Sequence, residues 1–237
     1  LTRREAMALA GAASAAALIN GAALAQGAPK KGGVLKVSAN ANPSSLDPQT
    51  GGAGSDHTML YPMYDTLTEW DYETLKPKPG LASSWSFTDP QTLVLNLRSG
   101  VTFHDGTVLD AEAVKFNFER AKTEQRSNIK ADLATVATIE VTGPLQVTLK
   151  LSQPDAALPG ILSDRAGMMV SPTAVKASGN IDRKPVGAGA YEFVSWTDNE
   201  KLVMKRYEKY WRANERHVDG IEFAILPSIA PAGGRGI

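Results

Sequence analysis

The side chains that could do chemistry are few and lie far apart along the chain. The three histidines, His57, His104 and His217, fall on different predicted elements, so a metal site would need carboxylates brought in from elsewhere. His104 precedes Asp105 and could form an acid/base pair with it, but Asp-Gly at this point is better explained by a tight turn. No nucleophile elbow, zinc-protease motif or Walker loop occurs. We therefore predict no catalytic residue, no metal site and no cofactor.

Two further classes of site are disfavoured by glycine and cysteine usage. Gly187-Ala188-Gly189 is the nearest approach to a dinucleotide fingerprint, but it lacks the third glycine and follows no strong strand. The chain contains no cysteine, which excludes disulfides, thiolate metal sites, a cysteine nucleophile and a cysteine-linked lipid anchor.

The composition is that of an ordinary globular protein of one or two domains. Hydrophobic residues make up 43% of the 237 residues, enough for a buried core. The 25 basic and 25 acidic residues cancel, which argues against nucleic acid as a partner and against a polybasic membrane-binding surface.

The first 25 residues have the pattern of an export signal. Arg3 and Arg4 open a positively charged region, residues 6–23 carry no charge, and Ala23-Leu24-Ala25 fits a signal-peptidase site before Gln26. The paired arginines resemble a twin-arginine signal, which predicts a periplasmic protein. A short transmembrane anchor is the alternative. Residues 26–33 are predicted to be a flexible leader.

The rest of the chain mixes helical and strand periodicity without regular alternation, which predicts a mixed α/β (α+β) fold. Helices are expected over 55–70, with Pro62 in its first two turns, and at 155–162 and 172–177. The clearest helix begins after its N-cap Asp110, with a buried face of Ala111, Val114, Phe118 and Ala121, and with Lys115, Asn117 and Arg120 off that face. Strands are expected at 34–37, 92–97, 139–141, 147–151, 191–196, 202–207 and 221–226.

Four sequence blocks, in a fixed order, carry a family resemblance. They are Leu46-Asp47-Pro48; Pro79 to Trp85; Leu97 to Thr107, running into Asp110 to Arg120; and Val186 to Tyr191, followed by Tyr210-Trp211. This order resembles the family 5 extracellular solute-binding proteins of ABC importers, the dipeptide, oligopeptide, glutathione and nickel class. The blocks have structural explanations too. Asp47-Pro48 fixes a turn, and the large aromatic residues are expected in the core: Trp85, Phe103, Phe118, Trp196 and Trp211.

The resemblance implies a type II periplasmic binding protein scaffold built around a cleft. Residues 34–69 and 185–237 would form a larger domain I, and residues 70–184 an inserted domain II. The family pattern is lost after Leu226, so the resemblance also implies an N-terminal half, truncated before the opposite lobe of the cleft. Full-length relatives of this kind are expected to be monomers.

Ligand contacts are implied by matching positions only. The loop after Leu46-Asp47-Pro48 contacts ligand in similar proteins, which here indicates Gly52, Gly54, Ser55 and Asp56. Arg165 is a second candidate, and Tyr191 and Trp196 are weaker ones. The alternatives are a helix N-terminus whose glycines serve the turn, and a solvated surface arginine at position 165.

The implied function is capture without reaction. A periplasmic receptor would close two lobes around a short peptide or similar small solute and deliver it to an ABC permease and its ATPase in the inner membrane. Nickel chelates, oligosaccharides and opines remain open as solutes. A periplasmic hydrolase on a similar scaffold, and a chemoreceptor adaptor or chaperone, are the rival functions.

Overall fold

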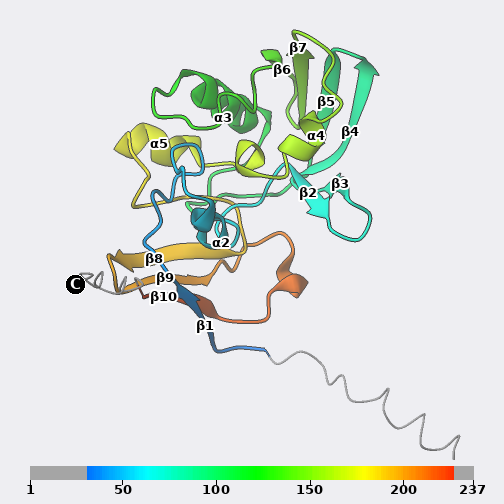
Figure 1. Ribbon diagram of the computed structural model, residues 1–237. Coiled ribbons are helices and arrows are strands. Elements are labelled where there is room, and N and C mark those ends of the chain that lie inside the picture. Colours follow the sequence, from blue (N-terminus) through cyan, green and yellow to red (C-terminus); the bar gives the residue numbers. More distant parts are fainter. Residues whose placement is uncertain (1–30, 227–237) are drawn as a thin grey trace, which may run out of the picture. The chain divides into compact units, whose positions relative to one another are not determined.

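The computed structural model describes residues 31–226, and its strands form two four-stranded sheets and one separate hairpin (Figure 1). The predicted signal peptide, most of the leader and the tail after Leu226 lie outside the described residues. The first sheet has the order β1-β10-β9-β8 and the second the order β4-β5-β7-β6, while β2 pairs with β3.

The first sheet joins the two ends of the described chain. Its strands are β1 (Val34–Ala39), β8 (Tyr191–Thr197), β9 (Lys201–Arg206) and β10 (Gly220–Ile225). β1 runs parallel to β10, with Val34 opposite Gly220 and Ala39 opposite Ile225, and the other pairs are antiparallel. All four strands expected here are confirmed.

The second sheet is antiparallel throughout. Its strands are β4 (Ala82–Asp89), β5 (Thr92–Leu97), β6 (Val136–Gly143) and β7 (Gln146–Leu151). Leu93, Leu95 and Leu97 of β5 are buried, as their alternation predicted, and β6 and β7 form the expected hairpin. β4 and the hairpin strands β2 (Thr68–Asp71) and β3 (Lys76–Pro79) were not predicted, because their sequences lack a clear apolar alternation.

The helix predicted over 55–70 is wrong in length. A short 3₁₀ turn, η1 (Gly54–Asp56), leads into α2 (His57–Leu60), and β2 already begins at Thr68. Pro62 lacks the amide hydrogen that would continue the helical ladder, and the chain turns after Leu60. The apolar residues of the predicted face are nevertheless buried: Met59, Leu60, Met63, Tyr64 and Leu67.

The helix after Asp110 is confirmed, as α3 (Ala111–Thr123). The Asp110 carboxylate accepts a hydrogen bond of 2.9 Å from the Ala113 amide, as an N-cap should. Two residues placed off its buried face are wrongly assigned. Asn117 is 1% exposed. Its side-chain NH2 donates to the Val170 carbonyl and its side-chain oxygen accepts from the Val170 amide. Arg120 reaches the buried Asp47.

The remaining helical segments are short. They are α4 (Leu158–Ile161), which lies within the predicted stretch 155–162, and α5 (Pro172–Ser178), which ends one residue beyond the predicted 172–177. The 3₁₀ turns are η2 (Arg165–Gly167) and η3 (Ala213–Glu215).

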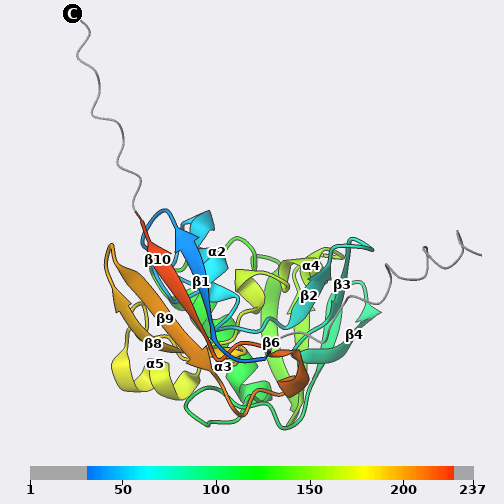
Figure 2. The same ribbon diagram turned by 90° about the horizontal axis from the view of Figure 1, so that it is seen from below.

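Two hydrophobic clusters fill the described region. One is formed mainly by α3 and the second sheet, the other by α2 and the first sheet, with α2 lying between the two sheets (Figures 1 and 2). Phe103 and Phe118 are fully buried, as expected. Trp85, Trp196 and Trp211 also pack against these clusters, as expected, but they are only partly buried.

Two of the sequence blocks are in direct contact. The turn at Asp105-Gly106 is confirmed, with Gly106 at φ +82°. The His104 amide donates to the Gly187 carbonyl (2.8 Å), and His104 Nε2 lies 3.0 Å from the Gly189 carbonyl oxygen. A Cβ at Gly187 would stand 2.1 Å from the Met63 carbonyl oxygen, so close backbone approach explains this glycine.

Candidate ligand-binding site

A loop over residues 51–56, which we call the glycine loop, follows the turn at Asp47-Pro48. Asp47 starts that turn by accepting a hydrogen bond from the Gln49 amide (3.0 Å), two residues on, as the sequence predicted. The Asp47 side chain is fully buried and forms an ion pair with Arg120 of α3. The turn that precedes the glycine loop is thereby fixed to α3, the longest helix within residues 31–226.

Arg165 holds the glycine loop from the other side. Its guanidinium donates to the carbonyl oxygens of Gly51 and Ala53, and lies 3.6 Å from the Asp56 carboxylate. Asp56 also accepts hydrogen bonds from the amide (2.9 Å) and hydroxyl (2.5 Å) of Ser44. The Asp56 side chain is fully buried and that of Arg165 is 9% exposed, so this network is a charge-assisted brace inside the protein.

The brace explains why the loop begins with glycine. A Cβ at Gly51 would lie 2.8 Å from the Arg165 guanidinium and 2.9 Å from the Asp56 carboxylate. Gly52, Gly54 and Ser55 are exposed, whereas Asp56 points inward. The loop therefore presents a fixed outer surface over residues 52–55.

The structure brings five of the seven sequence-predicted ligand residues together in this loop and its brace: Gly52, Gly54, Ser55, Asp56 and Arg165. The alternative of a solvated surface arginine is wrong, because Arg165 is buried. Tyr191 and Trp196 lie elsewhere, on β8, where both pack against the second hydrophobic cluster. Arg183 stacks on the Trp196 ring, with its guanidinium carbon 3.6 Å from the ring centroid.

A polar cluster that sequence reasoning missed lies beside the loop. His57 Nδ1 is 3.0 Å from the Gly54 carbonyl oxygen, and its Nε2 is 2.6 Å from an Asp164 carboxylate oxygen. The Tyr61 hydroxyl donates to the same carboxylate at 3.5 Å. Burial and the Asp164 charge raise the pKa of Tyr61 to about 12, so it stays a neutral phenol. No sequence signal paired Asp164 with residues more than 100 positions earlier.

Next to this cluster runs an aromatic groove, walled by Tyr61, Trp70 and Tyr72. One part, of about 680 Å³, is also lined by Gly160, Asp132 and Asp164. A second part, of about 400 Å³, shares the three aromatic residues and extends to a polar end lined by Asp65, Glu69, Tyr210 and Arg212. The groove lies between the β2–β3 hairpin, α4 and the end of α2.

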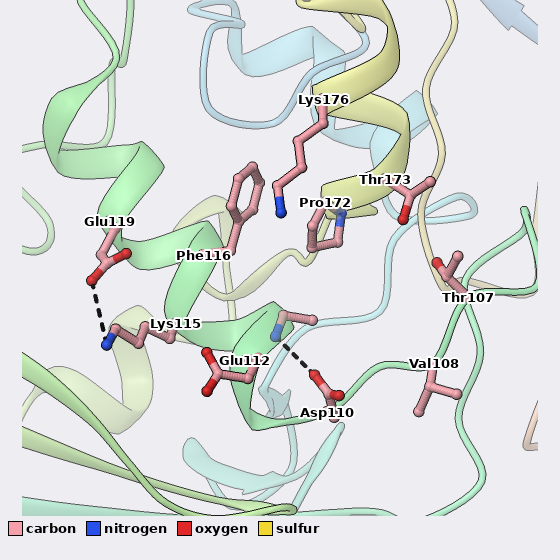
Figure 3. A pocket seen from close by; sticks show the side chains of 11 residues that line it. Thr107, Val108, Asp110, Glu112, Lys115, Phe116, Glu119, Pro172, Thr173 and Lys176 are labelled. Carbon is pink, nitrogen blue, oxygen red and sulfur yellow. Dashed lines mark hydrogen bonds and ion pairs between the residues drawn. The ribbon is translucent and has the colours of Figure 1, made fainter.

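Another depression, between α3 and α5, is less suited to a solute (Figure 3). Its charges are largely paired or used locally: Lys115 contacts Glu119 at 3.8 Å, Asp110 caps its helix, and Lys176 lies over the Phe116 ring. We interpret it as a solvated surface between two helices.

Metal binding and membrane spanning find no support in residues 31–226. No group of three or more potential metal-ligating side chains is found there. Within the same range no helix has the length and apolar character needed to cross a membrane. His104 is mostly buried, and burial lowers its pKa, so it serves as a neutral partner of the 187–189 backbone.

Comparisons with a family model and with individual relatives point to the same protein family. The model of the family described as bacterial extracellular solute-binding proteins, family 5 Middle, matches residues 76–232. The glutathione-binding protein GsiB of Salmonella paratyphi A is 31% identical over 188 residues. That match covers 78% of this chain and 36% of GsiB, so the chain spans little more than a third of this relative.

Solved structures of the same class share the fold. The ABC transporter-associated periplasmic binding protein DppA of Helicobacter pylori, in complex with the peptide STSA, matches with a TM-score of 0.75 at 24% identity, over 84% of this chain and 43% of DppA. NikZ of Campylobacter jejuni, in complex with Ni(L-His), matches with a TM-score of 0.73 at 24% identity, over 81% of this chain and 39% of NikZ. The predicted fold of mixed α/β periplasmic binding protein type is confirmed.

Proposed function

Because the chain belongs to family 5 of the bacterial extracellular solute-binding proteins, we propose that it acts as the substrate-binding component of an ABC importer. It would capture a short peptide or a similar small solute in the periplasm and deliver it to a membrane permease and its ATPase. The family is one of solute-binding proteins, which argues against the rival function of a periplasmic hydrolase. Membership over residues 76–232 is the observation that carries the proposal.

The glycine loop is the contact surface we propose for the solute. Its residues 52–55 face outward, and the buried Asp56–Arg165 brace fixes their backbone. A rigid, exposed loop can contact the main chain of a peptide while ignoring its side chains, which suits a receptor for varied peptides. In this proposal Asp56 and Arg165 act by positioning the loop, and Tyr191 and Trp196 remain secondary candidates.

Capture is proposed to involve closure of two lobes around a hinge. We propose that residues 34–69 plus 185–237 form domain I and that 70–184 form the inserted domain II. The two hydrophobic clusters support this division, although Met168, Val170 and Ile181 of the inserted segment pack in the cluster of the first sheet. The full-length protein is proposed to bind its solute as a monomer.

Peptides lead among the solute classes that the sequence leaves open, which also include nickel chelates, opines and oligosaccharides. Peptides are favoured by the likeness to DppA, whose structure contains a peptide, and to the glutathione-binding protein GsiB. A nickel chelate is the second candidate, because NikZ, solved with Ni(L-His), has an equally similar fold.

Native mass spectrometry of the intact gene product, purified from the periplasm without refolding, tests the proposal. We expect a stoichiometric peptide-sized mass that is released on denaturation. Uptake of labelled peptide should also fall in a deletion strain. Unchanged uptake, together with a ligand-free mass, would contradict the importer role, and a nickel-containing mass would select the second solute class.

A further inference from the structure

The three aromatic side chains that wall the aromatic groove are not part of the two buried hydrophobic clusters. Tyr72 is 82% exposed at the start of the hairpin turn, Tyr61 is 44% exposed, and Trp70 is partly exposed between them. Gly160 of α4 lies beside Trp70, where an added Cβ would be in van der Waals contact, at 3.4 Å, with the indole ring. Figure 1 shows the β2–β3 hairpin that carries two of these rings extending beside the second sheet. Three aromatic rings around an open groove form a surface suited to stacking on a ligand.

The charge lining the wider part of this groove is negative. Asp132 and Asp164 both line it, and no lysine or arginine does. Asp164 has His57 as a partner, whereas Asp132 makes no ion pair or side-chain hydrogen bond within residues 31–226. Partial burial, and secondly the Asp164 charge, raise the pKa of Asp132, in keeping with two carboxylates that line the same groove.

The positive charge at the far end of the groove is already used. Arg212 pairs with Glu69, lies 3.9 Å from Asp65, and stacks on the Trp211 ring at 4.5 Å. It therefore neutralises its own surroundings. Near Asp164, the Arg165 guanidinium, whose Nε lies 3.4 Å from His57 Nε2, is bonded to the carbonyl oxygens of the glycine loop and does not line the groove. The region around Tyr61, Trp70 and Tyr72 offers ring faces and carboxylates together.

Rings and carboxylates around one groove match a single ligand group. Ring faces attract a cation through their quadrupole, and carboxylates pair with an ammonium that brings its own hydrogen-bond donors. Two carboxylates without a third ligand do not make a metal site. We propose that the aromatic groove binds a protonated amine of the solute, with Asp132 and Asp164 as its counter-charges. This inference rests on the proposed solute-binding function and adds a cationic group to the definition of the solute.

A ligand-observed NMR titration of the intact chain at pH 7 tests the groove directly. The probes are Ala-Ala-Ala and N-acetyl-Ala-Ala-Ala, which differ by one positive charge. We expect acetylation to weaken binding by roughly tenfold, as the loss of one partly shielded charge contact implies. Asp132→Asn should weaken binding of the free-amine peptide by roughly fivefold and leave the acetylated peptide unaffected.

Matched variants separate the groove from general effects. Glu140→Gln, an exposed carboxylate on β6, removes the same charge outside the groove and should leave both affinities unchanged. Tyr72→Ala should weaken binding, whereas Phe87→Ala on β4 should not. Both side chains are exposed, so circular dichroism should show each variant folded.

The outcomes also distinguish this inference from the function on which it rests. Equal binding of the two peptides, no binding of the free-amine peptide, or equal effects of Asp132→Asn and Glu140→Gln would overturn the groove assignment. The importer role would then still stand on the uptake and mass measurements. If peptide uptake were unchanged in the deletion strain while the free-amine peptide still bound more tightly than the acetylated one, the importer role would be contradicted and the cation-binding groove retained.

Discussion

At the scale of single residues, the ion pair between Asp47 and Arg120 connects the turn before the glycine loop to α3. The Asp47 side chain is fully buried and that of Arg120 is 9% exposed. The helical spacing placed Arg120 on a solvent face, because periodicity cannot show a partner that lies 73 residues earlier in the chain. A buried charge is costly unless its partner is present, so each residue depends on the other.

Arg120→Ala should therefore be strongly destabilising. It leaves the Asp47 carboxylate buried without a counter-charge, which typically costs about 3–5 kcal/mol. Urea unfolding of the variant measures this loss. Lys115→Ala is the control on the same helix: it removes an exposed pair with Glu119 and should cost less than about 0.5 kcal/mol. Equal losses for the two variants would contradict the role assigned to Asp47–Arg120.

The candidate site was predictable only in part at this scale. Gly52, Gly54, Ser55 and Asp56 came from family resemblance, as Arg165 did, and from the residues alone only the turn at Asp47-Pro48 could be predicted. The brace could not be foreseen, because Arg165 and Asp56 are ion-paired across 109 positions of sequence. The same applies to the Tyr61–Asp164 contact and to the groove, which exists only once β2, α4 and α2 are in place.

At the scale of elements, strong periodicity gave reliable predictions and weak periodicity did not. β5 and α3 each have an uninterrupted apolar face, and both are confirmed. The segment 55–70 has helical apolar spacing as well, but Pro62 interrupts the ladder and tertiary contacts bury the same residues in a turn. Apolar spacing thus predicted which residues are buried there, and not the backbone that buries them.

β4 provides a second test at this scale. Trp85 pairs opposite Leu95 and packs against the first hydrophobic cluster, but it is only partly buried. Trp85→Ala should therefore cost about 2 kcal/mol, below the 3–5 kcal/mol typical of a fully enclosed aromatic residue. Thermal unfolding measures the loss, with the more exposed Phe87→Ala as a control that should cost less. An unchanged melting temperature combined with reduced solute affinity would instead identify Trp85 as a ligand-stacking residue.

A buried carboxylate links the segment before β2 to the segment after β9. Asp65 accepts hydrogen bonds from the Trp211 indole (2.6 Å) and the Tyr210 hydroxyl (3.1 Å). Burial raises the pKa of Asp65 to about 6, although these two bonds and Arg212 favour the charged form. Since the folded state holds this proton more tightly than the unfolded chain, the contribution of Asp65 to stability falls as pH rises from about 4 to 6.

Asp65→Asn should remove that pH dependence. The variant is expected to be less stable than the wild type at pH 4, because its amide cannot accept both hydrogen bonds. The difference in unfolding free energy should shrink by roughly 2 kcal/mol between pH 4 and 7. Urea unfolding at several pH values gives this difference. Asp89→Asn is the control, because the lowered pKa of Asp89 places its titration below this range. A constant difference for Asp65→Asn would contradict the raised pKa.

At the scale of the whole molecule, the first question is export. If Arg3 and Arg4 form a twin-arginine signal, replacing both with lysine should block export of a folded fluorescent protein fused after Gln26. Fluorescence in the periplasmic fraction measures the effect. The control is a fusion made after Gly33 in which Lys30 and Lys31 are replaced with arginine. Both lysines follow the predicted cleavage site, so export should be unchanged. Periplasmic fluorescence of the double lysine variant at the wild-type level would remove the twin-arginine assignment.

The second question is how tightly a polypeptide of residues 26–237 can bind a solute by itself. A closing cleft contacts its solute from two sides, and this chain spans 36% of the length of GsiB. If it supplies one wall, about half of the contacts are lost, and every 1.4 kcal/mol is a factor of ten in affinity. We therefore expect residues 26–237 to bind peptides no more tightly than roughly millimolar, measured by calorimetry or NMR titration.

The same polypeptide should also associate with itself. β1 is an edge strand among the described residues, and Val34 and Leu35 on it are 56% and 49% exposed. An open edge with apolar side chains favours pairing between chains, and a charge on it opposes pairing. Sedimentation velocity should show concentration-dependent association that Leu35→Lys reduces, whereas Tyr72→Lys, a substitution at an exposed position away from this edge, should not. A monomeric polypeptide of residues 26–237 that binds peptide with micromolar affinity would contradict both expectations, and the complete solute site would then lie within these residues.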